Sequence, residues 1–472
     1  MSRTRIQPAR WVAYDVIRAV TEDDAYANLL LPKLIAEARL NTQDAALATE
    51  LAYGTLRRRG TYDAIIADAA GRPVSEIDPA VLDALRLGAH QLLATRVAPH
   101  AAVNESVNLV AAEVGRGASG FANAVLRRIG RDDADTWQER IEAGARSDDE
   151  RLALRTAHPV WVIRALRRAL AAEGRDGELD ALLESDNLSP EVTLVALPGL
   201  AEPGEPRRPY AATAYGSPGG DPREAIAHAD GLIRVQDEGS QLVALALAGA
   251  APVREGERWL DLCAGPGGKT ALLGALAHQH GAALEANEVV PTRAGLVRNA
   301  VRPLPIPIRV HTQDGRAFAA QHPAAFDRIL VDAPCTGLGA LRRRPEARWR
   351  KSPSDVPELV ALQTQLLDAA ADALAPGGIV AYATCSPHLA ETTGVVSEVL
   401  HQRDDLVELD ARAVITGMSQ SPIDLGARGT DEPGALSAQL WPHRHGTDAM
   451  FVALLQRVPT TNGADSGAEG DE

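Results

Sequence analysis

The sequence of 472 residues predicts an α/β protein in which a bundle of helices precedes an alternation of strands and helices. Two observations predict this class. From residue 5 to about residue 131, apolar residues recur at helical spacing, and from about Gly231 short apolar runs alternate with helical stretches. Such an alternation is typical of a doubly wound, mostly parallel sheet, in which ligands bind outside the carboxyl ends of the strands.

The first part of the chain contains the helical pattern. The segment "ARWVAYDVIRAV" places Trp11, Val16 and Val20 on one apolar stripe. Helix starts are predicted at Asn41–Thr42, where a side-chain cap is available, and at Asp78–Pro79, which combines a cap with proline in the first turn. Five or so helices with short connections indicate a small bundle.

The middle of the chain has mixed signals. The acidic stretch "DDADTWQERIEAGARSDDE", which begins at Asp132, is predicted to be a solvated linker. The segment "HPVWVIRALRRAL" is expected to be helical and "EVTLVAL" to be a strand, whereas "LPGLAEPGEPRRPYAATAYGSPGGDP" is predicted to be loop because it is rich in proline and glycine.

The last part of the chain contains the predicted sheet. The predicted strands are "RWLDLC", "AALEANE", "IPIRVHT", "DRILVDA", "GIVAYAT" and "AMFVALL". We expect a disordered acidic tail after about Pro459. The predicted domains are 1–131, an all-helical bundle; 132–230, a linker and small mixed α/β subdomain; 231–458, the doubly wound sheet domain; and 459–472, the tail.

Composition restricts the class of protein. Three cysteines in so long a chain argue against a disulfide scaffold and favour a reducing compartment. No apolar run approaches the roughly 20 residues of a membrane span, so we expect a cytoplasmic protein without membrane contact. The net charge of −15 argues against broad nonspecific binding to nucleic acid. Residues 1–131, however, contain 16 basic and 14 acidic residues, which leaves room for a local basic face.

A small-residue turn, "LDLCAGPGGKT", joins the first predicted strand to a helix. Its glycines allow the backbone to approach a ligand closely, and the helix N-terminus offers free N–H groups to a carboxylate or phosphate. A structural turn is the alternative interpretation. A phosphate-binding P-loop is disfavoured, because that motif requires glycine six positions before the lysine, where Cys263 stands.

Two acidic residues follow the next predicted strands. Glu288 ends the second strand, 27 residues after Asp261 and a little beyond the approximate spacing of a ribose-binding acid, and Asp314 ends the third, where it could accept from an adenine amino group. Each acid alone could be a helix cap or a surface residue. Their positions at successive strand ends together favour a site for a cofactor that contains a nucleoside.

Two of the three cysteines lie at strand ends. Cys335 follows "VDAP" and Cys385 lies in "YATCSPH", at the ends of strands that we expect to be adjacent. Burial as small apolar residues is the alternative for both. We expect no metal site, because the chain has no CxxC motif and His388 is a single ligand rather than a set.

These motifs together resemble a known family. "DLCAGPGGKT", "DAPCTGLGALRRRPEARWR" and "TCSP" resemble the cofactor loop, motif IV and motif VI of the Sun (Fmu) family of RNA cytosine-C5 methyltransferases, and "LWPHRHGTDAMFVALL" resembles its last strand region. "ELAYGTLRRR" and "HAAVNESVNLVAAEVGRGASGFANAVLRRIG" resemble the NusB-like helical RNA-binding domain of the bacterial ribosomal-RNA subgroup. The resemblance covers the chain from about Arg10 to Gln456. The sequence departs from the family pattern at Gly265, where alanine is usual, after "TCSP", where only Glu391 of Glu-Glu-Asn is kept, and at "DAMF".

The resemblance implies a Rossmann-like methyltransferase sheet that uses S-adenosylmethionine to make 5-methylcytosine. It implies that Cys385 is the nucleophile that adds to C6 of cytosine, that Cys335 assists release of the product, and that Asp332 lies between the cofactor and the cytosine edge. The residues alone leave the roles of the two cysteines open. The cofactor-binding residues implied are Cys263, Ala264, Gly265, Pro266, Gly267, Gly268, Lys269, Glu288, Asp314 and Asp332, with Arg293 as a further contact and with Lys269 facing either cofactor or substrate.

RNA is the expected partner. The run "RRRPEARWRK" after motif IV carries six cations and Trp349, and we expect it to contact phosphates or a single strand; Arg57–Arg59 and Arg127–Arg128 form a second candidate patch. The helical domain favours 16S ribosomal RNA as substrate. Transfer RNA is the alternative within the same chemistry, and a noncatalytic RNA-binding assembly factor is the alternative of a different class. We expect a monomer.

Overall fold

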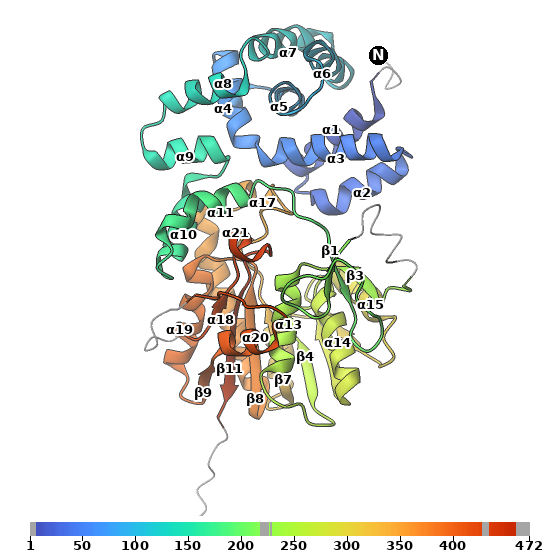
Figure 1. Cartoon of the computed structure of the whole chain (residues 1–472), viewed down its shortest axis with the longest axis vertical. Coiled ribbons are helices and arrows are strands. Elements are labelled where there is room, and N and C mark those ends of the chain that lie inside the picture. The colour runs from blue at the N-terminus through green and yellow to red at the C-terminus, as the bar shows by residue number, and fades with distance from the viewer. Residues whose placement is uncertain (1–5, 218–225, 227–228, 427–433, 459–472) are drawn as a thin grey trace, which may run out of the picture. The chain divides into compact units, whose positions relative to one another are not determined.

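The computed structural model describes residues 6–217, 226, 229–426 and 434–458 (Figure 1). The expected acidic tail, 459–472, lies outside the described residues. Within them, no helix is long and apolar enough to cross a membrane. The chain divides into two compact units, a helical unit of 1–167, 177–189 and 340–353, and an α/β unit of 168–176, 190–339 and 354–472.

The helical unit contains most of the helices of the N-terminal half. Its helices are α1 (Pro8–Glu22), α2 (Ala27–Glu37), α3 (Thr42–Arg57), α4 (Arg59–Ala70), α5 (Pro79–Ala94), α6 (Pro99–Glu113), α7 (Arg116–Ile129), α8 (Ala134–Ala143), α9 (Asp148–Thr156), α11 (Leu179–Ser185) and α17 (Ala347–Arg350), with a 3-10 turn η2 (Val74–Glu76). The elements α10 (Val160–Ala171), η3 (Asp176–Glu178) and η4 (Pro353–Asp355) lie where the chain passes from one unit to the other.

The predicted helix starts are confirmed. Asn41 caps α3 by accepting from the amide of Asp44, and Asp78 caps α5 by accepting from two amides while Pro79 occupies the first turn. The predicted stripe of α1 is buried in one apolar core that the helices α1 to α8 share. The bundle is therefore stabilised mainly by the burial of leucine, valine, isoleucine and alanine side chains.

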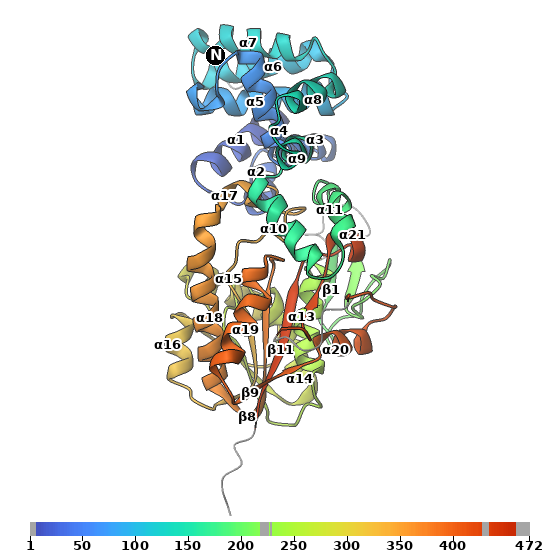
Figure 2. The ribbon, with the colours of Figure 1, turned by 90° about the vertical axis from the view of Figure 1, so that its left-hand side faces the viewer.

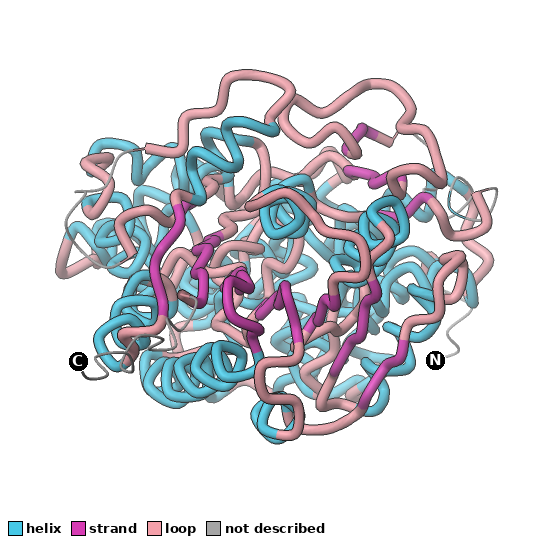
Figure 3. The backbone as a smooth tube through the Cα atoms, turned by 90° about the horizontal axis from the view of Figure 1, so that it is seen from below, coloured by secondary structure: helices cyan, strands magenta, loops and turns pink. Residues whose placement is uncertain are grey.

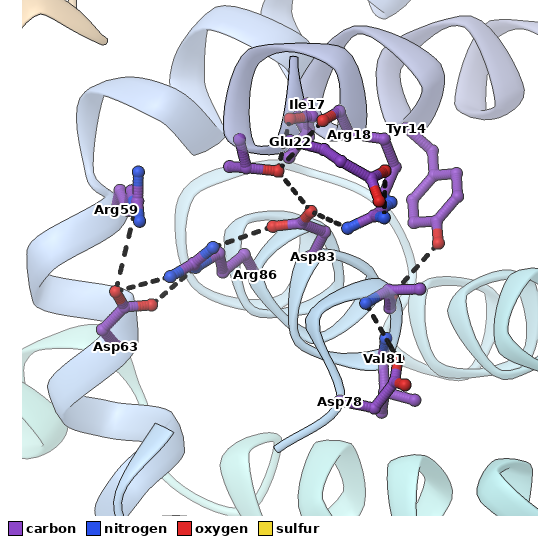
Figure 4. A network of polar contacts seen from close by, with 12 residues as sticks. Tyr14, Ile17, Arg18, Glu22, Arg59, Asp63, Asp78, Val81, Asp83 and Arg86 are labelled. Carbon is purple, nitrogen blue, oxygen red and sulfur yellow. Dashed lines mark hydrogen bonds and ion pairs between the residues drawn. The ribbon is translucent and has the colours of Figure 1, made fainter. Parts of the chain in front are cut away.

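A buried ion network joins three helices of this unit (Figure 4). Arg86 on α5 donates to both carboxylate oxygens of Asp63 on α4, at 2.6 and 2.8 Å, and to Asp83 at 2.8 Å. Asp83 also accepts from Arg18 on α1, at 3.0 Å. Each buried charge in the network therefore faces an opposite charge with hydrogen bonds, which is the condition under which such groups are tolerated in a core.

The predicted solvated linker after Asp132 is wrong. Ser147 caps α9, and α8 and α9 fold there. Trp137 is completely buried in the core of the bundle, where its indole N–H donates to the carbonyl of Ile129 at 2.8 Å. The many acidic residues lie on the outer faces of these helices. The acidic run is therefore the solvent-exposed surface of two folded helices. The predicted domain boundaries at residues 131 and 230 stay predictions, and the compact units are divided differently.

The α/β unit contains the predicted sheet. In its described residues, eight strands form one sheet in the order β10-β11-β8-β7-β4-β5-β6, with β9 paired to β11. The strands β4 to β8 pair in parallel, and β11 runs antiparallel to β8. Their bounds are β4 (Arg258–Asp261), β5 (Ala283–Asn287), β6 (Arg309–His311), β7 (Phe326–Asp332), β8 (Leu374–Thr384), β9 (Leu406–Leu409), β10 (Ala438–Gln439) and β11 (Phe451–Arg457).

Helices cover both faces of this sheet, as Figures 2 and 3 show. One apolar core lies beneath α13, α14, α15 and α20, and a second lies beneath α16, α18 and α19. The predicted doubly wound architecture is thereby confirmed. The helices of this unit are α13 (Glu238–Gly249), α14 (Gly268–His280), α15 (Pro291–Val301), α16 (Gly315–Ala320), α18 (Val356–Ala373), α19 (Thr393–Gln402), α20 (Ala411–Met418) and α21 (Pro442–His445), with a 3-10 turn η5 (Leu389–Glu391).

A small antiparallel sheet precedes the large one. It consists of β1 (Thr193–Ala196), β2 (Ala214–Gly216) and β3 (Ile233–Val235), with β1 in the centre. The strand predicted in "EVTLVAL" and the helix predicted in "HPVWVIRALRRAL" are confirmed by β1 and α10. In its described part, residues 197–217, the segment predicted as loop contributes β2 to this sheet.

Candidate active site

The carboxyl ends of five parallel strands carry the predicted site residues. In the pairing of β7 with β8, Asp332 lies opposite Ala383, and in the pairing of β4 with β7, Asp261 lies opposite Leu330. The loops that follow these strands therefore leave the same edge of the sheet. This edge is where open α/β sheets bind their ligands.

The two cysteines expected at adjacent strand ends lie together. The Sγ atoms of Cys335 and Cys385 are 3.5 Å apart, and both residues are half-buried, so one side of the pair faces outward. The contact with Cys385, together with burial, holds the pKa of the Cys335 thiol well above its usual value. Cys263, the third cysteine, lies in the glycine-rich loop, where burial raises the pKa of its thiol.

A lysine and a carboxylate lie beside the cysteine pair. The ammonium of Lys269, in the first turn of α14, is 2.8 Å from Oδ2 of Asp332, at the end of β7. Burial favours a lower pKa for Lys269, but the charge and the hydrogen bond of Asp332, together with the charges of Cys385 and Asp261, raise the pKa by more in sum. The ammonium is therefore close enough to Cys385 to stabilise a thiolate there.

The glycine-rich turn adopts the conformation that its sequence predicts. Gly267 has φ of 107° and caps α14, whose first amides are thereby directed toward the turn. Glu288 accepts from the amides of Gly265 and Val290, each at 2.9 Å. A side chain at position 265 would overlap the Glu288 carboxylate, so glycine in place of the usual alanine allows this close approach. Arg293 donates to the carbonyl of Gly265.

Two more carboxylates lie at this edge of the sheet. Asp314 caps α16 and pairs with Arg316, whose hydrogen bond lowers the pKa of the carboxyl to about 2. Asp261 is buried; it accepts from the hydroxyl of Thr270 at 2.7 Å, and its other oxygen has no hydrogen-bond partner. Burial raises the pKa of Asp261 to about 7. Helix amides, a glycine turn and carboxylates at four strand ends suit a cofactor that carries a carboxylate, an ammonium, ribose hydroxyls and an adenine amino group.

Two features of the site were not predicted from the sequence. Glu391, completely buried, accepts hydrogen bonds from the residues that follow both cysteines. Gly339 donates to the carbonyl of Cys385 and accepts from Ala449, each at 2.8 Å, and any side chain there would overlap both backbones. The sequence contained two signals for the role of Glu391. Glu391 is kept in an otherwise divergent motif, and a residue with a hydroxyl group follows each of the two cysteines.

The expected RNA contact of the cationic run is wrong for Arg348, and for Trp349, which is partly buried, it stays a prediction. Residues 340–353 belong to the helical unit. The guanidinium of Arg348 is fully buried and donates to main-chain carbonyls and to the Asn187 side chain, and the ring of Trp349 packs onto Gly60. The second candidate patch is divided, because Arg57 is buried whereas Arg127 and Arg128 are exposed. Among the described residues, no group of side chains could hold a metal ion.

Comparisons with known proteins agree with this geometry. The family model described as 16S rRNA methyltransferase RsmB/F matches residues 249–456, and the NusB family model matches residues 7–131. A Mycobacterium tuberculosis protein named "Putative methyltransferase Rv1407" is 48% identical over 469 residues, with 97% of this chain and 98% of the relative covered. Ribosomal RNA small subunit methyltransferase B of Erwinia tasmaniensis is 32% identical over 468 residues, with 94% of this chain and 98% of the relative covered.

A solved structure shows the same fold. The protein titled "Crystal Structure of PH0851" matches with a TM-score of 0.77 at 21% identity, over 96% of this chain and 99% of that protein. The resemblance drawn from the motifs is therefore confirmed, and with it the Rossmann-like sheet, the NusB-like helical region and S-adenosylmethionine as cofactor. The chain belongs to the RsmB/F family of ribosomal RNA methyltransferases.

Proposed function

We propose that this protein makes 5-methylcytosine in small-subunit ribosomal RNA, with Cys385 as nucleophile. The observation that carries the proposal is the pair of half-buried cysteine Sγ atoms 3.5 Å apart, beside Lys269 and Asp332. Two thiols in contact suit methylation at C5 of cytosine, because one can add to the ring and the other can help to release the methylated product.

The chemistry assigns a step to each group. C5 of cytosine is a poor nucleophile until a thiolate adds to C6. The Cys385 thiolate forms a bond to C6, the ring electrons move toward C5 and N3, and N3 takes up a proton through Asp332, which we place beside it. S-adenosylmethionine, when bound, supplies an electrophilic methyl group to C5. Loss of the C5 proton to a base then restores the C5–C6 double bond, expels Cys385 as thiolate and returns the N3 proton through Asp332.

The charges around the two sulfurs support this division of roles. Lys269 lies on the side of Cys385 and favours its thiolate, whereas the nearness of Cys385 raises the pKa of Cys335. When Cys385 is bonded to carbon it is a neutral thioether, which accepts a hydrogen bond more weakly than a thiolate, so the contact that raises the pKa of Cys335 weakens. Cys335 can then lose its proton to solvent and accept the proton from C5. The contact between the thiols and the charge of Lys269 together support this order.

Residues of the loop and the strand ends would hold the cofactor. In this proposal, residues 263–269 enclose the methionine part, Glu288 accepts from the ribose and Asp314 accepts from the adenine amino group. Lys269 serves the substrate side, because its ammonium is paired with Asp332 and acts on Cys385. All these groups come from the α/β unit of one chain, which supports action as a monomer.

The relatives support small-subunit ribosomal RNA as the substrate. Proteins named as ribosomal RNA small subunit methyltransferase B align over nearly the whole of this chain, NusB-like region included. This favours 16S ribosomal RNA over transfer RNA. A noncatalytic assembly factor would have no need for the paired thiols, the Lys269–Asp332 pair and the glycine turn.

Bisulfite sequencing of ribosomal and transfer RNA tests the proposal. Cells that lack the protein should lose protection at a cytosine of small-subunit ribosomal RNA, and the wild-type gene, but not a gene carrying Cys385→Ala, should restore it. Loss of protection in transfer RNA alone would assign the other substrate. Unchanged protection in both RNAs would overturn the proposed activity.

A further inference from the structure

A buried carboxylate lies beneath the cysteine pair. Oε1 of Glu391 accepts from the amide of Thr336 at 2.8 Å and from Nε2 of Gln363 at 3.2 Å. Oε2 accepts from the hydroxyls of Thr336 and Ser386, at 2.5 and 2.6 Å. Four hydrogen bonds to one buried carboxylate each offset part of the cost of removing the group from water.

The donors are the immediate neighbours of the reactive residues. Thr336 follows Cys335 and Ser386 follows Cys385 in the chain, and their hydroxyl oxygens are 3.1 Å apart. The two segments leave different strands, β7 and β8, and are 50 residues apart in sequence. One carboxylate thus joins the two loops whose relative position determines the distance between the sulfur atoms.

The carboxylate is itself held from two sides. Gln363, on α18, donates to the carbonyl of Pro334, the residue before Cys335, at 2.8 Å as well as to Glu391. Tyr382, on β8, donates from its hydroxyl to the main-chain carbonyl of Glu391 at 2.7 Å. Glu391, Gln363 and Tyr382 are each buried without measurable exposure. Such support fixes the position of the carboxylate, which is a requirement for groups that orient reacting atoms.

We propose that Glu391 is the positioning residue of the cysteine pair, because its carboxylate fixes the residue after each cysteine and thereby sets the two sulfur atoms against each other. This inference rests on the proposed methylation by Cys385. It assigns Glu391 no contact with the cytosine or with the cofactor.

The charge of Glu391 has a second effect. It is among the causes that raise the pKa of the Cys335 thiol, after the contact with Cys385 and burial. The negative charge therefore keeps the proton on Cys335 in the resting protein and makes Cys335 a stronger base once that proton has left. A single carboxylate thus orients both thiols and raises the pKa of one of them, Cys335.

Two variants separate position from charge. Glu391→Gln keeps the shape and can still bond to all four donors, because the two hydroxyls can rotate to accept from its amide, but it removes the charge. The double variant Thr336→Val, Ser386→Ala keeps the charge and removes both hydroxyl ties. Glu238→Gln is the matched control, since Glu238 is a buried carboxylate of the same unit that accepts from the amides of Tyr210 and Ala211, away from the cysteines.

The first measurement is the pH dependence of Cys335 alkylation by iodoacetamide in the full chain, followed by peptide mass spectrometry without RNA. We expect Glu391→Gln to lower the midpoint by about 0.5 pH unit or more, and Glu238→Gln to leave it unchanged. An unchanged midpoint in Glu391→Gln, or an equal shift in both variants, would refute the effect of charge. Because no RNA is present, this result does not depend on the proposed methylation.

The second measurement is single-turnover methyl transfer to RNA with bound cofactor. We expect the double variant to react about 100-fold more slowly than wild type, since a displacement of about 1 Å can have this effect. Transfer at the wild-type rate would overturn the positioning role. Absence of transfer in the wild type would instead contradict the proposed function, so the two failures are distinguishable.

Discussion

Two neighbouring stretches of this chain, 332–339 and 340–353, show how differently charged and reactive residues can be used. The first belongs to the α/β unit and presents Asp332 and Cys335 at a half-buried edge of the sheet. The second belongs to the helical unit, where Arg348 is completely buried. Both were expected at a ligand site, and in the second stretch Arg348 is too deeply buried to contact one. Whether a charged or reactive residue of these stretches can contact a ligand depends on whether its side chain is exposed to solvent.

Burial changes the pKa in both units, but with different consequences. Burial lowers the pKa of Arg348 to about 10, so its guanidinium stays charged at neutral pH and serves as a donor to backbone carbonyls. Burial raises the pKa of Asp261 to about 7, so its carboxyl changes charge near neutral pH. A shift of this kind affects behaviour in the cell only where it crosses the working pH.

Removal of the nucleophile should have the largest effect. We expect Cys385→Ala to reduce methyl transfer by at least about 1,000-fold, because the thiolate that we propose to add to C6 is removed. Calorimetry should show S-adenosylmethionine bound with nearly unchanged affinity. If the variant retained wild-type transfer, Cys385 would not be the nucleophile and the proposed roles of the two thiols would be wrong.

Replacement of the buried Arg348 should lower the stability of the protein and leave its affinity for RNA unchanged. Arg348→Met leaves several buried carbonyls without a donor, so we expect the helical unit to lose about 3 kcal/mol in urea denaturation followed by circular dichroism. The exposed control Arg127→Ala should change stability by less than about 0.5 kcal/mol. Full stability of Arg348→Met with weakened RNA binding would instead make Arg348 an RNA contact.

The buried aspartate should be visible in the pH dependence of stability. The folded pKa of Asp261 is above its unfolded value, so its stabilising contribution is fully present below about pH 4 and is lost as the pH rises to about 7. Asp261→Asn removes this loss. Relative to wild type, the variant should therefore gain about 2 kcal/mol between pH 5 and pH 8 in urea denaturation. Parallel curves for the two proteins would show that Asp261 is ionised throughout.

The adenine contact should give the smallest effect. Asp314→Ala should weaken S-adenosylmethionine binding about tenfold in calorimetry, the usual loss for one hydrogen bond to a charged group. Asp327, a carboxylate at the start of β7 that pairs with Arg254, serves as the control, and Asp327→Ala should bind normally. Equal affinities for wild type and Asp314→Ala would reject the adenine role.

The sequence allowed us to predict that the site residues lie together, because the topology of the sheet places the carboxyl ends of its parallel strands at one edge. The contact between Cys335 and Cys385 follows from this rule together with the adjacency of β7 and β8. Glu391 was not assigned a role, since its donors come from three separate segments and no local pattern brings them together. Trp137 and Arg348 were misinterpreted because charged neighbours in sequence suggested an exposed face, whereas both side chains are buried.

The most direct test of the account is the variant Cys335→Ala, incubated with S-adenosylmethionine and the RNA substrate and separated under denaturing conditions. If Cys385 is the nucleophile and Cys335 assists release, the methylated RNA should stay covalently bound, and mass spectrometry should find the cytosine attached to Cys385. Free, fully methylated RNA with no retarded protein, or an adduct at another residue, would contradict the division of roles between the two thiols.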